Sequence, residues 1–339
     1  MPAAEATVRT FLQPILPFLR EEGLTELCIN RPHEIWCEGR GGWKHHAIAD
    51  DRLSFDSLSG LATVAAGYTK QDIDSEHPVC STTLPDGERC QIVIPPAVPE
   101  GTVSITIRKP GEIKFSLSDF DRMGFFKQIA DGQAGLSAHD QELLQLRKAG
   151  LWERFFDLAV KTRKNIIISG ATGSGKTTFS KSLIDSIPAY ERIITIEDTL
   201  ELDVSAPNHV RLLYSKDGQG LSKAGPKQLL ESSLRMRPDR ILLQELRDSA
   251  AYYYLRNANS GHPGSITTVH ADSPMGAFEQ LTLLAKESEG GSQIDRGDIR
   301  ALLLMLVDIV VQVKKFPDGR RSVTDLYFEP EKQLAQGLC

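Results

Sequence analysis

Residues 165–187 read NIIISGATGSGKTTFSKSLIDSI, in which an apolar β-branched run, a glycine-rich loop and a segment with helical spacing follow one another directly. A short run rich in isoleucine favours a buried strand, and apolar residues three and four positions apart favour a helix. Strands that alternate with helices form parallel sheets, which bind ligands at the carboxyl ends of their strands. This stretch therefore predicts an α/β domain with a ligand-binding loop at one edge of its sheet.

The loop contains a complete G-x-x-x-x-G-K-T pattern from Gly170 to Thr177. Glycines let backbone N–H groups converge on a phosphate, and the following helix directs the positive end of its dipole to the same place. Lys176 is suited to neutralise the β- and γ-phosphates, and the Thr177 hydroxyl is suited to ligate Mg²⁺. The pattern predicts a P-loop NTPase that uses ATP and Mg²⁺; the alternative is a fortuitous glycine-rich turn. The candidate nucleotide-binding residues are Gly170, Ala171, Thr172, Gly173, Ser174, Gly175, Lys176, Thr177 and Thr178.

The pattern along the rest of the chain predicts two domains. With 339 residues, the chain is longer than one hydrophobic core usually supports. Residues 1–108 contain short alternating runs and turns, which indicate an α+β N-terminal domain. Residues 109–150 are interpreted as a linker with helical segments, one of which begins at Ala138. Residues 151–339 alternate helix and strand patterns and add C-terminal helices, as expected for an α/β ATPase domain.

Two carboxylate clusters come at the ends of strands in this predicted sheet. The run RILLQE ends in Glu245, and the run RIITIED ends in Glu197 and Asp198. A carboxylate at such a position can reach the magnesium ion or polarise the attacking water. We therefore predict catalytic roles for Glu245 and Glu197, and metal ligands from Thr177, Glu197, Asp198 and Glu245. The alternative is that a strand-end carboxylate caps the next helix or pairs with an arginine.

One histidine and two arginines complete the set of candidates. His270 ends the strand pattern GSITTV and could bind or sense the γ-phosphate, although a strand-end histidine can equally be a structural hydrogen-bonding group. Arg89 and Arg108 lie in the N-terminal half, far in sequence from the P-loop. An arginine supplied by another domain or subunit can stabilise charge on the γ-phosphate. Surface arginines are common, so the spacing alone leaves this role open.

Composition restricts the classes of partner. The formal net charge of −6 and the pI near 5.8 give no general attraction to nucleic acid, so direct sequence-specific binding to it is not expected. No C-x-x-C pair occurs, which argues against a zinc site and favours a reducing cytosol. No apolar run reaches the roughly 18 residues of a membrane-spanning helix. The segment FLQPILPFLREEGL is either an amphipathic helix in peripheral contact with a membrane or, because of Pro14 and Pro17, a packed or broken helix.

Four segments together resemble the motifs of a known family. GATGSGKTT, RIITIEDTLEL, LRMRPDRILLQELRD and SGHPGSITTVHAD are similar, in order and spacing, to the Walker A, Asp box, Walker B and His box of the type II/IV secretion ATPases. In the first half, ELCINRPHEIWCE and LPDGERCQIVIPPAVPEGTVSITIRKP resemble the N-terminal domain of the VirB-type traffic ATPases of type IV secretion and conjugation. The resemblance covers roughly residues 10–330.

The resemblance implies a RecA-like ATPase domain and a role for each motif residue. Lys176 and Thr177 would be the phosphate and magnesium residues, Glu245 the catalytic carboxylate and His270 the γ-phosphate reader. The residues Glu197 and Asp198 would support catalysis from the Asp box, and Arg89 and Arg108 would contact phosphate from the N-terminal domain. The chain departs from the family at Gln244, where a small residue usually precedes the glutamate.

The resemblance also implies partners and a location. Members are homo-hexameric rings that work with the inner-membrane and cytoplasmic components of a type IV secretion system, at the inner-membrane face. They support pilus assembly and the passage of secreted protein or nucleoprotein substrates. Three alternatives stay open: a type II secretion or type IV pilus ATPase, a nucleotide-gated scaffold with little turnover, and a DNA translocase.

Overall fold

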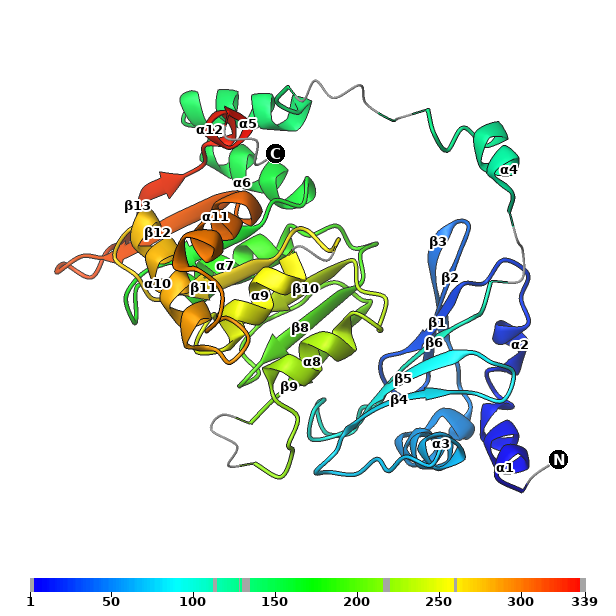
Figure 1. Cartoon of the computed structure of the whole chain (residues 1–339). Coiled ribbons are helices and arrows are strands. Elements are labelled where there is room, and N and C mark those ends of the chain that lie inside the picture. The colour runs from blue at the N-terminus through cyan, green and yellow to red at the C-terminus, as the bar shows by residue number, and fades with distance from the viewer. Residues whose placement is uncertain are drawn as a thin grey trace.

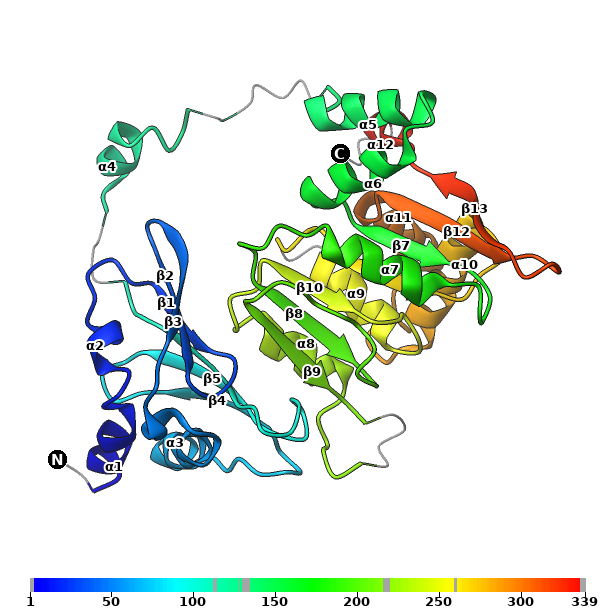
Figure 2. The ribbon, with the colours of Figure 1, turned by 180° about the vertical axis from the view of Figure 1, so that it is seen from behind.

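The structure is a computed structural model that describes residues 3–111, 115–127, 129, 135–215, 220–258 and 261–335. Figures 1 and 2 show two bodies, each made of a sheet with helices, and the short helix α4 (Leu117–Arg122), which lies apart from both. The fold class agrees with the sequence prediction: a P-loop α/β domain follows a smaller α+β domain.

The N-terminal domain is an antiparallel sheet with helices on one face. Its six strands are ordered β3-β2-β1-β6-β5-β4. The helix α1 packs on α3, and both contribute to one apolar core with the sheet. The N-terminal segment forms two short helices. It therefore matches the second alternative of the sequence analysis, a helix that the prolines break. The elements are α1 (Ala3–Leu12), α2 (Leu16–Leu19), β1 (Glu26–Ile29), β2 (Glu34–Gly39), β3 (Gly42–Ala47), a 3-10 turn (Asp51–Leu53), α3 (Phe55–Tyr68), β4 (Val79–Thr83), β5 (Arg89–Val93) and β6 (Ser104–Arg108).

The C-terminal domain contains a sheet whose parallel strands end at the P-loop edge. Strands are paired in the orders β10-β8-β9 and β11-β7-β12-β13, with only β13 antiparallel. A parallel bridge between Glu245 and Thr268 connects the two groups. The strands are β7 (Ile166–Ser169), β8 (Ile193–Glu197), β9 (His209–Leu213), β10 (Arg240–Leu243), β11 (Ile266–Val269), β12 (Ile309–Lys315) and β13 (Arg321–Tyr327).

Helices cover both faces of this sheet. Ile167 faces the core formed with α8 to α11, whereas its neighbours Ile166 and Ile168 face the core formed with α5, α6 and α7. Because both faces are buried, β7 is apolar along its whole length instead of alternating with polar residues. The helices are α5 (Ala138–Lys148), α6 (Trp152–Lys161), α7 (Lys176–Asp185), α8 (Pro226–Ser233), α9 (Ala250–Ala258), α10 (Pro274–Glu287), α11 (Arg296–Leu306) and α12 (Pro330–Ala335).

The helix predicted from Ala138 is present as α5, but its contacts place it in the C-terminal domain. Leu143 and Leu146 are buried in the core shared with α6. Lys164 pairs with Asp140 at 2.7 Å, and Arg147 donates to the carbonyl of Phe328 at 2.6 Å. The predicted linker of residues 109–150 therefore includes a helix that packs as part of the ATPase domain.

The two domains of the chain meet at the fully buried Arg192, at the start of β8. Its guanidinium donates to Asn30 at 2.7 Å and to Asn208 at 2.5 Å, and it lies 5.6 Å from the centre of the Trp43 ring. Arg237 also donates to both oxygens of Glu38 across the boundary. The N-terminal sheet thus contacts the edge of the parallel sheet where the strands begin.

The remaining sequence expectations concern cysteines and membrane helices. The cysteines within the described residues are buried and unpaired, and burial raises the pKa of the Cys37 thiol to about 12. Among the described helices, none combines the length and apolar character needed to cross a bilayer. The cysteines of the chain are Cys28, Cys37, Cys80, Cys90 and Cys339, the last of which lies outside the described residues.

Replacing Glu191 by alanine is expected to lower the free energy of unfolding by about 3–5 kcal/mol, because Arg240 becomes a buried charge without its partner. Arg240 lies 2.7 Å from Glu191, and both side chains are almost fully buried. Urea unfolding monitored by circular dichroism measures the change. The control is Asp157→Ala, which removes an exposed pair with Lys161 and should cost at most about 1 kcal/mol. Equal losses in both variants would contradict this account.

Candidate active site

The glycine loop between β7 and α7 has a geometry that side chains would prevent. A Cβ atom on Gly170 would lie 2.4 Å from the carbonyl oxygen of Val313, so the loop packs directly on β12. Gly173 and Gly175 have φ values of 74° and 99°, which favour glycine. These two positions turn the chain tightly into α7, whose first residue is Lys176. The loop is therefore built as a P-loop, with its backbone N–H groups at the start of a helix.

Three of the predicted residues meet beside this loop. The Nζ atom of Lys176 donates to the carbonyl oxygens of Gly170 and Ala171 and lies 3.4 Å from Nδ1 of His270. The other ring nitrogen of His270, Nε2, lies 2.9 Å from Oε1 of Glu245. Burial lowers the pKa of Lys176, and the negative charge of Glu245 opposes this effect. His270 thus lies between the predicted phosphate-binding lysine and the predicted catalytic carboxylate.

This meeting follows from the sheet topology. Lys176 follows β7, Glu245 follows β10 and His270 follows β11. The parallel strand β11 pairs with β7, and the bridge at Glu245 brings the end of β10 next to β11. Parallel neighbours end at the same edge, so their side chains converge there.

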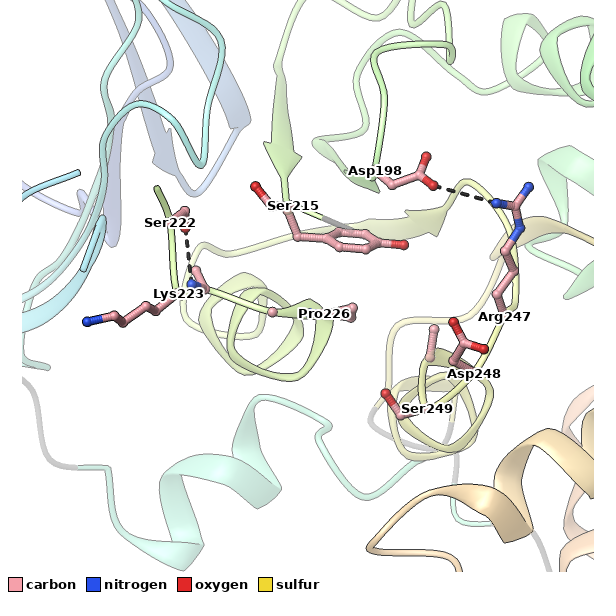
Figure 3. Close-up of a pocket in the computed structure, with 12 residues that line it drawn as sticks. Asp198, Ser215, Ser222, Lys223, Pro226, Arg247, Asp248 and Ser249 are labelled. Carbon is pink, nitrogen blue, oxygen red and sulfur yellow. Dashed lines mark hydrogen bonds and ion pairs between the residues drawn. The ribbon is translucent and has the colours of Figure 1, made fainter. Parts of the chain in front are cut away.

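Arg247 and Asp198 extend the charged network away from the P-loop. Arg247 pairs with Glu245 and lies 3.7 Å from Asp198. Figure 3 shows this contact at the rim of a cavity of about 420 Å³, where Asp248 and Ser249 also line the wall. Asp198 was predicted as a metal ligand. In this structure its charge faces Arg247 instead of the P-loop threonine.

Glu197 was predicted as a catalytic residue and metal ligand, but the structure gives it another set of partners. Its side chain is fully buried, and Arg211 donates to both of its oxygens, at 3.0 and 2.9 Å. The hydroxyl of Thr195 and the backbone N–H groups of Glu201 and Leu202 donate to the same carboxylate. With five donors, its lone pairs are engaged, so Glu197 fixes the loop after β8 and does not face the P-loop.

Gln244, the departure from the family pattern, also binds this loop. Its Oε1 accepts from the N–H of Asp198 at 3.2 Å, and its Nε2 donates to Glu201 at 2.9 Å. The side chain therefore connects the end of β10 to the loop after β8. Its contacts direct it to the loop after β8, away from the predicted catalytic carboxylate of Glu245.

The donor set fits a magnesium ion that binds together with a nucleotide. Within the described residues, no group of three or more His, Cys, Asp or Glu side chains is arranged to hold a metal. Mg²⁺ commonly takes only one or two protein oxygens and obtains others from substrate phosphates and water. Thr177, half-buried in the first turn of α7, and Glu245 are the residues that would hold it.

Arg89 and Arg108 do not reach the P-loop of their own chain. They are direct neighbours on β5 and β6, and Arg108 lies 3.5 Å from Glu26. Burial raises the pKa of Glu26 to about 7, against the opposing charge of Arg108. The two arginines line clefts with Arg237, which precedes β10, and these clefts contain no P-loop residue. They therefore lie beside the edge where the parallel strands begin, opposite the P-loop edge.

Two residues of the site were missed by the sequence analysis. Arg247 stands two positions after Glu245, but nothing in the sequence says that it turns back to pair with that carboxylate. Arg211 lies on β9, and its pairing with Glu197 depends on the parallel register of β8 and β9. The alternation of polar and apolar residues in HVRL is typical of a strand, but it does not identify the neighbouring strand.

Alanine substitutions at Glu197 and Arg211 are expected to be strongly coupled. Each removes one partner of a buried pair and should destabilise the protein, whereas the double variant should cost little more than either single variant. We expect a coupling energy of about 1–3 kcal/mol in a double-mutant cycle based on urea unfolding. Additive losses would show that the two side chains do not act as a unit.

Comparison with known proteins agrees with the sequence motifs. The family described as type II/IV secretion system protein matches residues 10–314. The chain is 53% identical to the type IV secretion system protein VirB11 of Bartonella henselae, with 97% of this chain and 94% of that protein covered. It is 41% identical to the VirB11 protein of Brucella suis, with 98% and 93% covered.

A solved structure gives the same result in three dimensions. The crystal structure of the VirB11 ATPase from the Brucella suis type IV secretion system, in complex with sulphate, superposes with a TM-score of 0.92. The match covers 99% of this chain and 98% of that one, at 41% identity. The similarity therefore includes the arrangement of both domains. The chain belongs to the type II/IV secretion system protein family and, within it, is a type IV secretion ATPase.

Proposed function

We propose that the chain is the ATP-hydrolysing motor of a type IV secretion or conjugation system and works as a homo-hexamer. The observation that carries this proposal is the placement of His270 between Lys176 and Glu245. A phosphate-binding cation and a carboxylate at the same edge of the sheet are what ATP hydrolysis needs, and His270 lies where it can respond to the γ-phosphate. The comparisons with VirB11 proteins support the cellular role.

Each residue around the P-loop has its own role in the proposed hydrolysis of ATP. Lys176 leaves the loop carbonyls and neutralises the β- and γ-phosphates. Thr177 and Glu245 would hold Mg²⁺, which would supply charge neutralisation on the phosphates. Glu245 orients the attacking water and accepts its proton. His270 contacts the γ-phosphate. Its contacts with Lys176 and Glu245 therefore change with the presence of that phosphate.

Arg89 and Arg108 would complete the site of a neighbouring subunit. In their own chain they lie beside the edge where the strands begin, whereas the P-loop lies at the opposite edge. A ring places different edges of adjacent subunits against each other, so a heterologous contact brings the arginines of one subunit to the nucleotide of the next. Such arginines stabilise transition-state charge and couple hydrolysis to domain movement.

The location and partners follow from this motor role. The ring would lie in the cytoplasm, in peripheral contact with the inner membrane and with the membrane components of the secretion system. Its cycle would support pilus assembly and the passage of protein or nucleoprotein substrates. The segment that carries α4 would allow the domains to move relative to one another.

Glu245→Gln is expected to reduce ATP turnover at least about 100-fold while the protein still binds ATP, because the amide cannot accept the proton of the attacking water. Phosphate release measures turnover, and light scattering with and without nucleotide measures the assembly. Glu279→Gln serves as the control, since Glu279 pairs with Arg296 and Arg300 away from the P-loop. A monomer with equally negligible turnover in the parent protein and the Glu245 variant would favour a nucleotide-gated scaffold.

Mixing two inactive variants tests whether the arginines act between subunits. Lys176→Ala lacks a working P-loop, and Arg89→Ala combined with Arg108→Ala lacks the arginines. If the arginines serve a neighbour, mixed rings regain activity, because intact arginines of one variant meet the intact P-loop of the other. Activity that stays at the sum of the separate variants would show that each chain uses its own arginines.

A further inference from the structure

The hairpin between β12 and β13 brings an arginine onto the P-loop. Arg321, the first residue of β13, donates from Nε to the carbonyl oxygen of Gly173 at 3.2 Å. Its Cδ lies 2.9 Å from the position that a Cβ atom on Gly175 would occupy. The side chain is exposed, and within the described part of the chain its guanidinium has no second hydrogen-bond or ion-pair partner. The terminal nitrogens of this cation are therefore available to a ligand.

The order of strands fixes the direction of a bound triphosphate. The strand β7, which leads into the P-loop, lies between β11 and β12. Glu245 and His270 lie on the β11 side, where the γ-phosphate must be for hydrolysis. The phosphate chain then runs along the loop, so the α-phosphate lies on the opposite side, toward β12 and β13. Arg321 lies on that side.

There is also room for a nucleoside beyond Arg321. A groove of about 730 Å³ begins at Ser322 and Val323, and its walls include Trp152, Phe156 and Phe179. Phe179 lies in the same first turns of α7 as the P-loop lysine, and it packs on Phe156 with ring centroids 5.2 Å apart. Aromatic walls next to a phosphate-binding loop are compatible with a ribose and a base.

We propose that Arg321 is a nucleotide-binding residue: a cation from the β12–β13 hairpin that contacts the α-phosphate of the nucleotide held by the P-loop. This inference rests on the proposed function, because it takes ATP as the ligand. It adds a second cation on the nucleoside side of the site, opposite the group formed by Lys176, His270 and Glu245. ATP and ADP both have an α-phosphate, so Arg321 contributes to the binding of both nucleotides. The residues around the γ-phosphate distinguish ATP from ADP.

The preceding residue provides a matched comparison. Arg320 has the same side chain and belongs to the same hairpin, but its Nε donates to Asp318 at 2.6 Å and its guanidinium lies 5.7 Å from the Phe316 ring centre. Its contacts are confined to the hairpin. Arg320→Gln therefore removes one exposed positive charge from the hairpin without removing a P-loop contact.

The test measures the Kd of ADP and of ATP by isothermal titration calorimetry for four variants of the full-length protein. Arg321→Ala and Arg321→Gln are expected to weaken both nucleotides about tenfold, which corresponds to the loss of one charge-assisted hydrogen bond. Arg321→Lys retains the charge and should stay within about threefold of the parent protein, as should Arg320→Gln. At saturating ATP the turnover of Arg320→Gln should remain within about threefold of the parent protein, because the contacts of Arg320 are confined to the hairpin.

Two results would overturn the proposal. In the first, Arg321→Ala binds both nucleotides as the parent protein does. In the second, Arg321→Gln retains the affinity for nucleotide while Arg321→Lys loses it. A neutral donor to the Gly173 carbonyl would then suffice for nucleotide binding, and Arg321 would only support the loop. A parent protein that binds no nucleotide would instead refute the proposed function, so the two failures are distinguishable.

Discussion

The site depends on one constraint of the sheet: β7 pairs in parallel with β11, and a bridge connects β11 to Glu245. It places the ends of three strands next to one another, although they are far apart in the sequence. Lys176, His270 and Glu245 then need only short side-chain extensions to come into contact. The isoleucines on both faces of β7 are buried between two layers of helices, and this burial stabilises the strand in the centre of the sheet.

A second layer of interactions keeps the loops at this edge in position. The buried carboxylate of Glu197 binds Arg211 and two backbone N–H groups, and Gln244 connects the same loop to β10. The contacts given for these groups hold the loop after β8 and the residue that precedes Glu245. Glu197, which holds a loop, and Glu245, the proposed catalytic residue, are thus both carboxylates at strand ends. They differ in burial and in their partners.

The sequence predicted the fold class and the P-loop, because these depend on local motifs. The rule that parallel strands end at one edge also predicted that Glu245 and His270 lie at the P-loop edge, and their chemical roles remain predictions. For Glu197 the sequence left open a catalytic role and pairing with an arginine, since the partner Arg211 and the complete burial are properties of the folded sheet. It also gave no sign of Arg321, which is 148 residues from the glycine it contacts. The location of Arg89 and Arg108 depends on how the two domains are placed relative to each other. No local sequence pattern predicts that placement.

A crystal structure of the protein with Mg²⁺ and a non-hydrolysable ATP analogue tests the central claim most directly. The account predicts that the γ-phosphate lies among Lys176, His270 and Glu245, with the metal on Thr177 and the nucleoside directed toward β13. A γ-phosphate on the β12 side of the loop, remote from Glu245, would contradict it.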